Sequence, residues 1–160
     1  MLAGSEASLS GPTPRTNWLP PTWGFYKDVH LFGAAKFQLP SISTRDHGYT
    51  GVGYIQGFDT SGTAASFYLR RGKAGRYRVA FRVANGESGA VKTMSVYVNG
   101  IFACRLRIKP TGSWNQWSEV SKYLNLVAGN NVITVRRDEN DSGGIHLNGL
   151  LIPYQPTLGS

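Results

Sequence analysis

RYRVAFRVA (residues 76–84) decides the fold class of this chain, because apolar residues recur at every second position along it. The apolar set is Tyr77, Val79, Phe81 and Val83, and the basic set is Arg76, Arg78 and Arg82. Successive side chains of an extended segment point to opposite faces, so the apolar set faces a core and the basic set faces solvent. The stretch is therefore expected to be a half-buried β-strand.

Seven further strands are expected from the same alternation or from short apolar runs between turn residues. They lie within 23–37, around Tyr54, and at 93–100, 101–109, 117–126, 130–137 and 145–152. Asn99-Gly100 separates two of them and is a strong signal for a tight hairpin turn. Because no stretch has a convincing helical period, the chain is predicted to be all-β, an antiparallel β-sandwich of the jelly-roll type.

The composition is typical of a loop-rich β domain rather than a helical one. Of 160 residues, 41% are hydrophobic, only 16% are charged and 20 are glycines. The formal charge of +8 favours an acidic partner, such as a uronic or sulfated polysaccharide, nucleic acid or an anionic surface. A basic surface that only keeps the protein soluble explains the charge equally well.

The chain is expected to hold one domain with short extensions. Residues 10–22 contain four prolines, so 1–22 is assigned to an N-terminal extension or linker, 23–153 to the sandwich and 154–160 to a C-terminal tail. The single cysteine, Cys104, alternates with apolar residues and is expected to be buried. No signal peptide or membrane span is visible, and Met1 is interpreted as an initiator added to an excised domain.

Six phrases, in this order along the chain, carry a family resemblance. They are GYTGVGYIQGF (48–58), AGRYRVAFRVANG (74–86), VYVNG (96–100), TGSWNQW (111–117), LNLVAGNNVITV (124–135) and GGIHLNGLLI (143–152). Over residues 23–153 the chain resembles the carbohydrate-binding modules of family 35, with family 6 as the sister family.

The resemblance implies a non-catalytic module that binds a polysaccharide or oligosaccharide in the loops at one end of the sandwich. Its implied partner is the catalytic domain of a secreted carbohydrate-active enzyme, and no membrane partner is expected. The ligand is expected to be a galactan, a glycan containing uronic acid, or a glucan. Mannans are also family ligands, and the fold does not select among these sugars.

The resemblance also implies a structural calcium site, which this sequence lacks the carboxylates to form. The family's early glutamates correspond to Ala3 and Ser5 in one register and to Phe25 and Lys27 in the favoured one, and its closing aspartate to Asn148. A hard cation needs such paired carboxylates, so no metal or other cofactor is expected. The acidic loop 138–142 is another place for calcium, but such loops are usually only solvated.

Trp114 is the expected platform on which a sugar stacks. It follows Thr-Gly-Ser in the loop before a strand, where the matching tryptophan of families 6 and 35 often contacts sugar. The flat C–H face of a sugar packs well against an aromatic ring. The alternative is a tryptophan that packs on the rim of the sandwich. Trp117, at the start of the next strand, is expected to lie in the core.

Four more residues of the predicted site lie in the first and the last of these six phrases. Asn148 matches a sugar-binding asparagine of family 6, with a hydrogen bond to a neighbouring loop as the alternative. His146 lies on the same strand face and is either a donor to the ligand or a plain surface residue. Tyr54 matches a second stacking aromatic of family 6 and Tyr49 a loop tyrosine of family 35, and one of them is expected to pair with Trp114.

The turn formed by Asn85, Gly86 and Glu87 is expected to lie beside the loop that carries Trp114 and to complete the site. Asn85 is a candidate ligand contact, although turn asparagines more often bond their own backbone. Arginines of strand 76–84 would join Arg105, Arg107 and Lys109 in one basic face if the two strands were neighbours. A solvated face is favoured over a second binding site there.

Two other classes of function remain as alternatives. A small jelly-roll polysaccharide lyase or other glycan-processing enzyme needs an acid and a base within hydrogen-bond reach, and His30, His47 and His146 are scattered along the chain. A protein- or nucleic-acid-binding sandwich suits the positive charge, but no nucleic-acid motif is present, so nucleic acid is not the expected partner.

Overall fold

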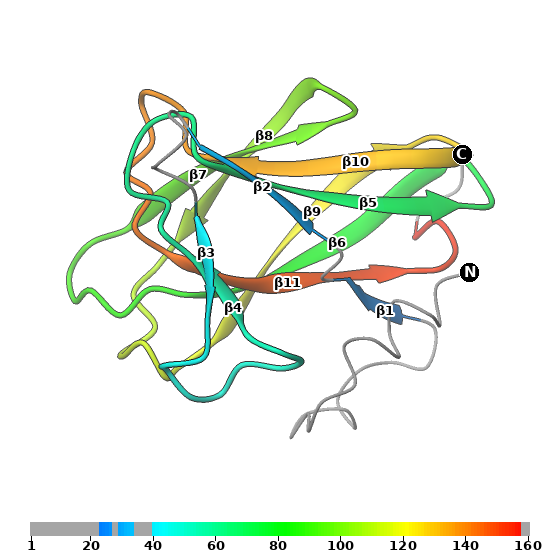
Figure 1. The fold of residues 1–160 in the computed structure, drawn as a ribbon. Helices are drawn as coiled ribbons and strands as arrows, with labels where there is room; N and C mark the ends of the chain where they lie inside the picture. Colours follow the sequence, from blue (N-terminus) through cyan, green and yellow to red (C-terminus); the bar gives the residue numbers. More distant parts are fainter. Residues whose placement is uncertain (1–22, 27–28, 34–39, 158–160) are drawn as a thin grey trace.

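The computed structural model describes residues 23–26, 29–33 and 40–157, which form two packed antiparallel β-sheets (Figure 1). The strands are β1 (Trp23–Tyr26), β2 (Val29–Phe32), β3 (Ser41–Ser43), β4 (Tyr54–Gln56), β5 (Ala64–Arg71), β6 (Gly75–Ala84), β7 (Lys92–Val98), β8 (Ile101–Ile108), β9 (Ser118–Leu126), β10 (Gly129–Arg136) and β11 (His146–Pro153). In this described part of the chain no helix is long and apolar enough to cross a membrane.

The first sheet has the order β3-β4-β11-β6-β9, and β1 pairs with the C-terminal half of β11. The second sheet has the order β2-β5-β10-β7-β8. Strands that follow one another in the sequence often lie in opposite sheets, as a jelly roll requires, so the predicted all-β sandwich is confirmed. The sequence did not predict β3 and β5.

The core lies between the inner faces of the two sheets. The apolar side chains of β6, Tyr77, Val79, Phe81 and Val83, are fully buried, as their spacing predicted. Met94 on β7 belongs to the same apolar cluster from the second sheet. Each such large side chain stabilises the fold by roughly 1.5 to 3 kcal/mol, so this layer holds the sandwich closed.

The hairpin between β7 and β8 turns at Asn99 and Gly100. Their φ angles are 51° and 85°, which is the left-handed pair of a type I′ turn that asparagine and glycine favour. Cys104 on β8 is half-buried against the core, and its burial raises the pKa of the thiol. The tight turn expected at Asn99-Gly100 is confirmed, whereas Cys104, which was expected to be buried, is only half-buried.

The single basic face expected from β6 and β8 does not form, because the two strands belong to different sheets. Arg82 of β6 is also not a solvated residue, since its exposed fraction is only 3%. On β8, Arg105 pairs with the buried carboxylate of Asp141 at 3.1 Å. The period of two marked the outward face of β6 correctly but did not reveal that other parts of the chain cover one end of it.

The acidic loop after β10 is held by its own neighbours. Asp141 accepts a hydrogen bond from the Ser95 hydroxyl at 2.6 Å, and Asp138 accepts bonds from Tyr97 and Arg136, both at 2.5 Å. Hydrogen bonds from Tyr97 and Arg136 lower the pKa of Asp138 in spite of its partial burial. The carboxylates of Asp138 and Asp141 thus pair with side chains of the sandwich.

The ends of the predicted sandwich coincide with β1 and β11. The tail is tied to β6, because Thr157 donates its N–H to Arg76 O at 2.8 Å and its hydroxyl accepts from Arg78 N at 2.9 Å. Residues 1–22, which include the extension and the candidate positions Ala3 and Ser5, lie outside the described residues, and so does Lys27.

Candidate functional site

The loop between β8 and β9 is tied to the turn after β6 at one end of the sandwich, on the left of Figure 1. Thr111 donates its N–H to Asn85 O at 2.8 Å, and its hydroxyl accepts from Asn85 N at 3.1 Å. The buried Asn85 amide donates to Ala90 O and Ile108 O, and its oxygen accepts from Glu87 N. Asn85 therefore positions these loops and is not free to contact a ligand, which corrects its assignment as a ligand contact.

Gly86 lies directly beneath Trp114. A Cβ atom on Gly86 would stand 2.5 Å from three atoms of the indole ring, Cγ, Cδ1 and Cδ2. No real Cβ approaches another atom so closely, so only glycine lets the indole rest where it does. Gly86 thus contributes to the predicted site by leaving space for the Trp114 indole.

His146, the first residue of β11, lies between two aromatic rings. Its imidazole is 4.3 Å from the Trp114 ring centroid and 4.6 Å from that of Tyr54, on which it stacks. Tyr54 is fully buried, and Tyr49, half-buried, packs on it at 5.9 Å. The ring that pairs with Trp114 is therefore His146, and the expectation that Tyr49 or Tyr54 would pair with it is wrong.

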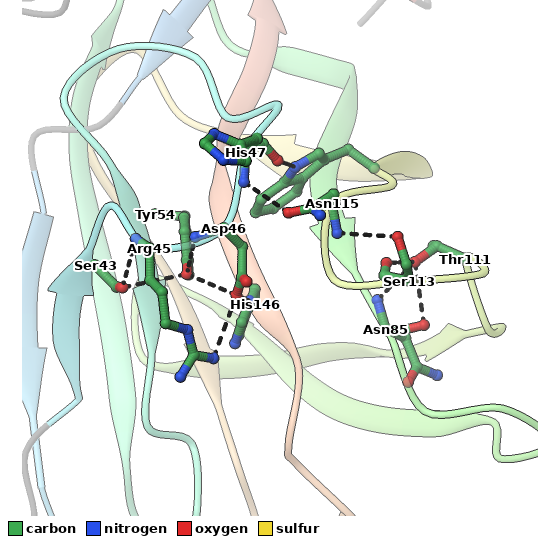
Figure 2. Close-up of polar contacts among 11 residues, drawn as sticks. Ser43, Arg45, Asp46, His47, Tyr54, Asn85, Thr111, Ser113, Asn115 and His146 are labelled. Atoms are coloured by element: carbon green, nitrogen blue, oxygen red, sulfur yellow. Dashed lines mark hydrogen bonds and ion pairs between the residues drawn. The ribbon is translucent and has the colours of Figure 1, made fainter.

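Asp46 joins Tyr54 and His146 through polar contacts (Figure 2). The Tyr54 hydroxyl donates to Asp46 Oδ2 at 2.9 Å, and His146 Nδ1 lies 3.7 Å from the same oxygen. His146 Nδ1 is buried and has no hydrogen-bond partner. Burial lowers the pKa of His146 to about 4, and the Asp46 carboxylate opposes that shift only in part. The imidazole is therefore neutral at pH 7.

Asn148 is fully buried and anchors the loop 44–53 over the outer face of the first sheet. Its oxygen accepts from the N–H and the hydroxyl of Thr50 and from the Arg82 guanidinium, each at 2.8 Å. Its amide donates to Thr50 O and Gly53 O, each at 3.0 Å. Asn148 thus has no capacity left for a sugar hydroxyl, so its direct binding role is corrected and the loop-bonding alternative holds.

Trp117 is half-buried on the outer face of the first sheet and does not belong to the core between the sheets. Its Nε1 donates to His47 O at 2.9 Å, and the Arg82 guanidinium lies 5.3 Å from its ring centroid. His47 N in turn donates to Asn115 at 2.7 Å (Figure 2). Trp117 therefore links the loop 44–53 to the loop that carries Trp114.

A pocket of about 490 Å³ opens beside the Trp114–His146 pair. It is lined by Ser41, Gln56, Gly57, Asp59, Glu87, Trp114, Gly144, Ile145 and His146. Of the residues predicted from the sequence, Trp114, Glu87 and His146 reach this pocket, and Tyr54, Asn85 and Asn148 lie buried behind it. Sequence reasoning missed Ser41, Gln56 and Asp59, although Gln56-Gly57 marks a strand end, where binding residues often gather.

The pocket wall combines two aromatic rings with hydrogen-bonding side chains. The Glu87 and Asp59 carboxylates accept hydrogen bonds, the Gln56 amide both donates and accepts, and the rings offer an apolar surface. This combination suits a hydroxyl-rich ligand with flat apolar faces.

The residue that the resemblance aligns with the closing aspartate of the family calcium site is Asn148. Its oxygen faces the positively charged guanidinium of Arg82 at 2.8 Å. A hard cation needs several free oxygens, preferably carboxylates. Among the described residues there is also no cluster of three or more His, Cys, Asp or Glu side chains arranged to hold a metal ion.

Comparison with known proteins defines the class of this chain. The model of the family described as carbohydrate binding module (family 6) matches residues 36–148. The 1,6-alpha-glucosyltransferase of Sporosarcina globispora is 33% identical over 135 residues, which are 83% of this chain and 10% of that enzyme. The chain thus spans about a tenth of the length of the curated relatives it matches.

Two solved structures share the fold at 27% identity. A family 35 carbohydrate binding module from Clostridium thermocellum gives a TM-score of 0.72, with 81% of this chain and 96% of that chain covered. A cycloisomaltooligosaccharide glucanotransferase from Paenibacillus sp., solved in complex with cycloisomaltoheptaose, gives a TM-score of 0.71, with 80% of this chain and 17% of that chain covered.

The chain is therefore a carbohydrate-binding module. It belongs to family 6, and its fold is shared with family 35, so the resemblance seen in the sequence is confirmed. In the enzymes that it matches, the corresponding segment is a small part of a much longer chain, as in an accessory binding module.

Proposed function

We propose that the pocket beside Trp114 binds an α-linked glucan or one of its oligosaccharides. The observation that carries this proposal is the Trp114–His146 ring pair on the wall of a pocket that also offers Gln56 and Glu87. The names of two relatives, a 1,6-alpha-glucosyltransferase and a cycloisomaltooligosaccharide glucanotransferase, support a glucan as the ligand.

Isothermal titration calorimetry with isomaltotriose and dextran tests this proposal. Trp114→Ala should reduce binding below detection without lowering the melting temperature, because the indole is half-exposed in a loop. Tyr123→Ala is the matched control, since Tyr123 is an exposed aromatic of β9 that does not line the pocket. Wild-type affinity in the Trp114 variant would refute this location of the site.

We also propose that the module is non-catalytic and serves a longer, secreted carbohydrate-active enzyme. This proposal is supported by the matched enzymes, in which the corresponding segment is about a tenth of the chain, and by His146, which is neutral and packed between two rings. Incubation with dextran, pectin and xylan should release no reducing or unsaturated chain ends. Their appearance in a preparation that loses this activity with Trp114→Ala would show an enzyme instead.

We propose further that binding and folding need no calcium at the family position. The Arg82 guanidinium already satisfies the Asn148 oxygen, as a cation would. Melting followed by circular dichroism, with and without EDTA, should give the same transition temperature. A large decrease with EDTA that added calcium reverses would show that a metal site exists.

A further inference from the structure

The pocket carries a charge opposite to that of the whole molecule. The chain has 17 basic and 9 acidic residues, a formal charge of +8. The charged side chains that line the pocket are nevertheless the carboxylates Asp59 and Glu87, and no lysine or arginine is found among the lining residues that the structure describes. The net charge of the protein is therefore a poor guide to the ligand of this pocket.

Lys92 lies against the pocket wall, and its charge is already engaged. Its Nζ lies 3.2 Å from Glu87 Oε2, and only 14% of its side chain is exposed. The same Nζ would be 3.4 Å from a Cβ on Gly144, which lines the pocket. The ammonium thus stands behind the wall, where it holds Glu87 in place rather than meeting a ligand directly.

The imidazole in the wall adds no positive charge at neutral pH. His146 is packed between Trp114 and Tyr54, with an exposed fraction of 8%. Behind it lies a third carboxylate, Asp46, at 3.7 Å from Nδ1, and Arg45 pairs with the same oxygen of Asp46 at 3.4 Å. The charged groups that line the pocket itself are therefore carboxylates, which accept hydrogen bonds from a ligand.

We infer that this pocket selects uncharged sugars and rejects sugars that carry a carboxylate. Hydroxyl groups donate readily to the Asp59 and Glu87 carboxylates, and such charge-assisted hydrogen bonds are stronger than neutral ones. A uronic acid would instead bring a further carboxylate beside these two, and none of the described residues that line the pocket is an arginine or lysine that could receive it. The inference rests on the proposed function, since it concerns the ligand of the same pocket.

The test compares two ligands that differ only in charge. They are isomaltotriose and the analogue in which the C6 hydroxymethyl group of its non-reducing terminal glucose is a carboxylate. Titration calorimetry at low ionic strength should show the carboxylated sugar binding at least about tenfold more weakly, and the gap should narrow in about 0.5 M salt.

The double variant Asp59→Asn, Glu87→Gln removes both carboxylates and leaves Lys92 without its partner. The affinity ratio of the neutral to the carboxylated sugar should then fall by about tenfold or invert. Glu139→Gln, an exposed carboxylate outside the pocket, is the matched control and should leave the ratio unchanged.

Each outcome separates the inference from the proposed function. Equal or tighter binding of the carboxylated sugar by the wild type, lost in Trp114→Ala, would overturn the inference and leave the binding function standing. An unchanged ratio in the double variant would also overturn it. Absence of binding of either sugar to the wild type would overturn both.

Discussion

Gly86→Ala is the sharpest probe of the site, because it adds one methyl group directly beneath the indole of Trp114. The new Cβ would stand 2.5 Å from Cγ, Cδ1 and Cδ2, where ordinary contact begins at 3.4 Å. The indole must therefore move by about 1 Å or tilt away. Gly86 is not among the residues with a positive φ angle, so alanine suits its backbone and the strain falls on the ring alone.

The displacement should weaken sugar binding without unfolding the module. A shift of about 1 Å forfeits a quarter to a half of each dispersion contact between the ring and the sugar and disturbs the Trp114–His146 pair. We expect a loss of about 1 to 2 kcal/mol, which is a five- to thirty-fold increase in Kd. The cost to stability should stay below about 1 kcal/mol, because Trp114 is half-exposed and has room to move outward.

Calorimetry with isomaltotriose measures the affinity, and near-ultraviolet circular dichroism reports the indole environment. Gly72→Ala is the matched control, since a Cβ there would meet nothing within 4 Å and Gly72 also has no positive φ. Wild-type affinity together with an altered dichroism spectrum in Gly86→Ala would refute Trp114 as the binding platform. Wild-type values of both would refute the close packing of the indole on Gly86.

Three further outcomes are expected. Asn148→Ala should destabilise the fold by about 2 to 4 kcal/mol in urea unfolding, because it removes one acceptor of the buried Arg82 guanidinium and the hydrogen bonds that hold the loop 44–53, and a cost no larger than that of the exposed Asn125→Ala would contradict this. His146 has a folded pKa of about 4 against an ordinary 6.5, so the unfolded chain binds the extra proton and stability should fall by about 2 to 3 kcal/mol as pH drops from 6.5 to 4. Melting curves of His146→Gln recorded over this pH range should not show the decline. If the wild type and the variant lose stability equally as the pH falls, His146 is not its cause. Asp141→Ala should cost about 2 to 3 kcal/mol by removing the partner of Arg105 and Ser95, yet leave isomaltotriose affinity unchanged, and loss of binding in a folded variant would tie that loop to the site.

The strands with one buried face and one solvent-exposed face were predictable from the sequence, because apolar and polar residues alternate along them. The segment 76–84 and the hairpin at Asn99-Gly100 are examples. β5 was not recognised, because its first four residues are all buried and its apolar side chains do not alternate with polar ones. A strand segment that is buried on both faces lacks the alternation by which strands are found.

The pocket lies among the loops in which the sequence predicted a site, but only some of the predicted residues line it. Trp114, Glu87 and His146 reach the pocket because strand-end loops gather at one end of a sandwich. Asn148 and Tyr54 were misassigned because the loop 44–53 covers their face of the sheet, at a sequence separation of 98 residues between Thr50 and Asn148. A local sequence pattern does not reveal which residues will be covered by a loop that is distant in the sequence.

The contacts of Asn148 also set an order of events during folding. Thr50 and Gly53 hydrogen-bond to Asn148 in β11, and Trp114 packs on His146 of the same strand, which follows the other described strands in the sequence. Contacts between residues so far apart in the sequence form late in folding, because the entropy of closing a long loop is lost before these contacts stabilise the fold. A nascent or truncated chain that ends before His146 would therefore hold most of the sandwich strands yet lack the finished pocket. Capture of a glycan becomes possible only when the closing strand is in place.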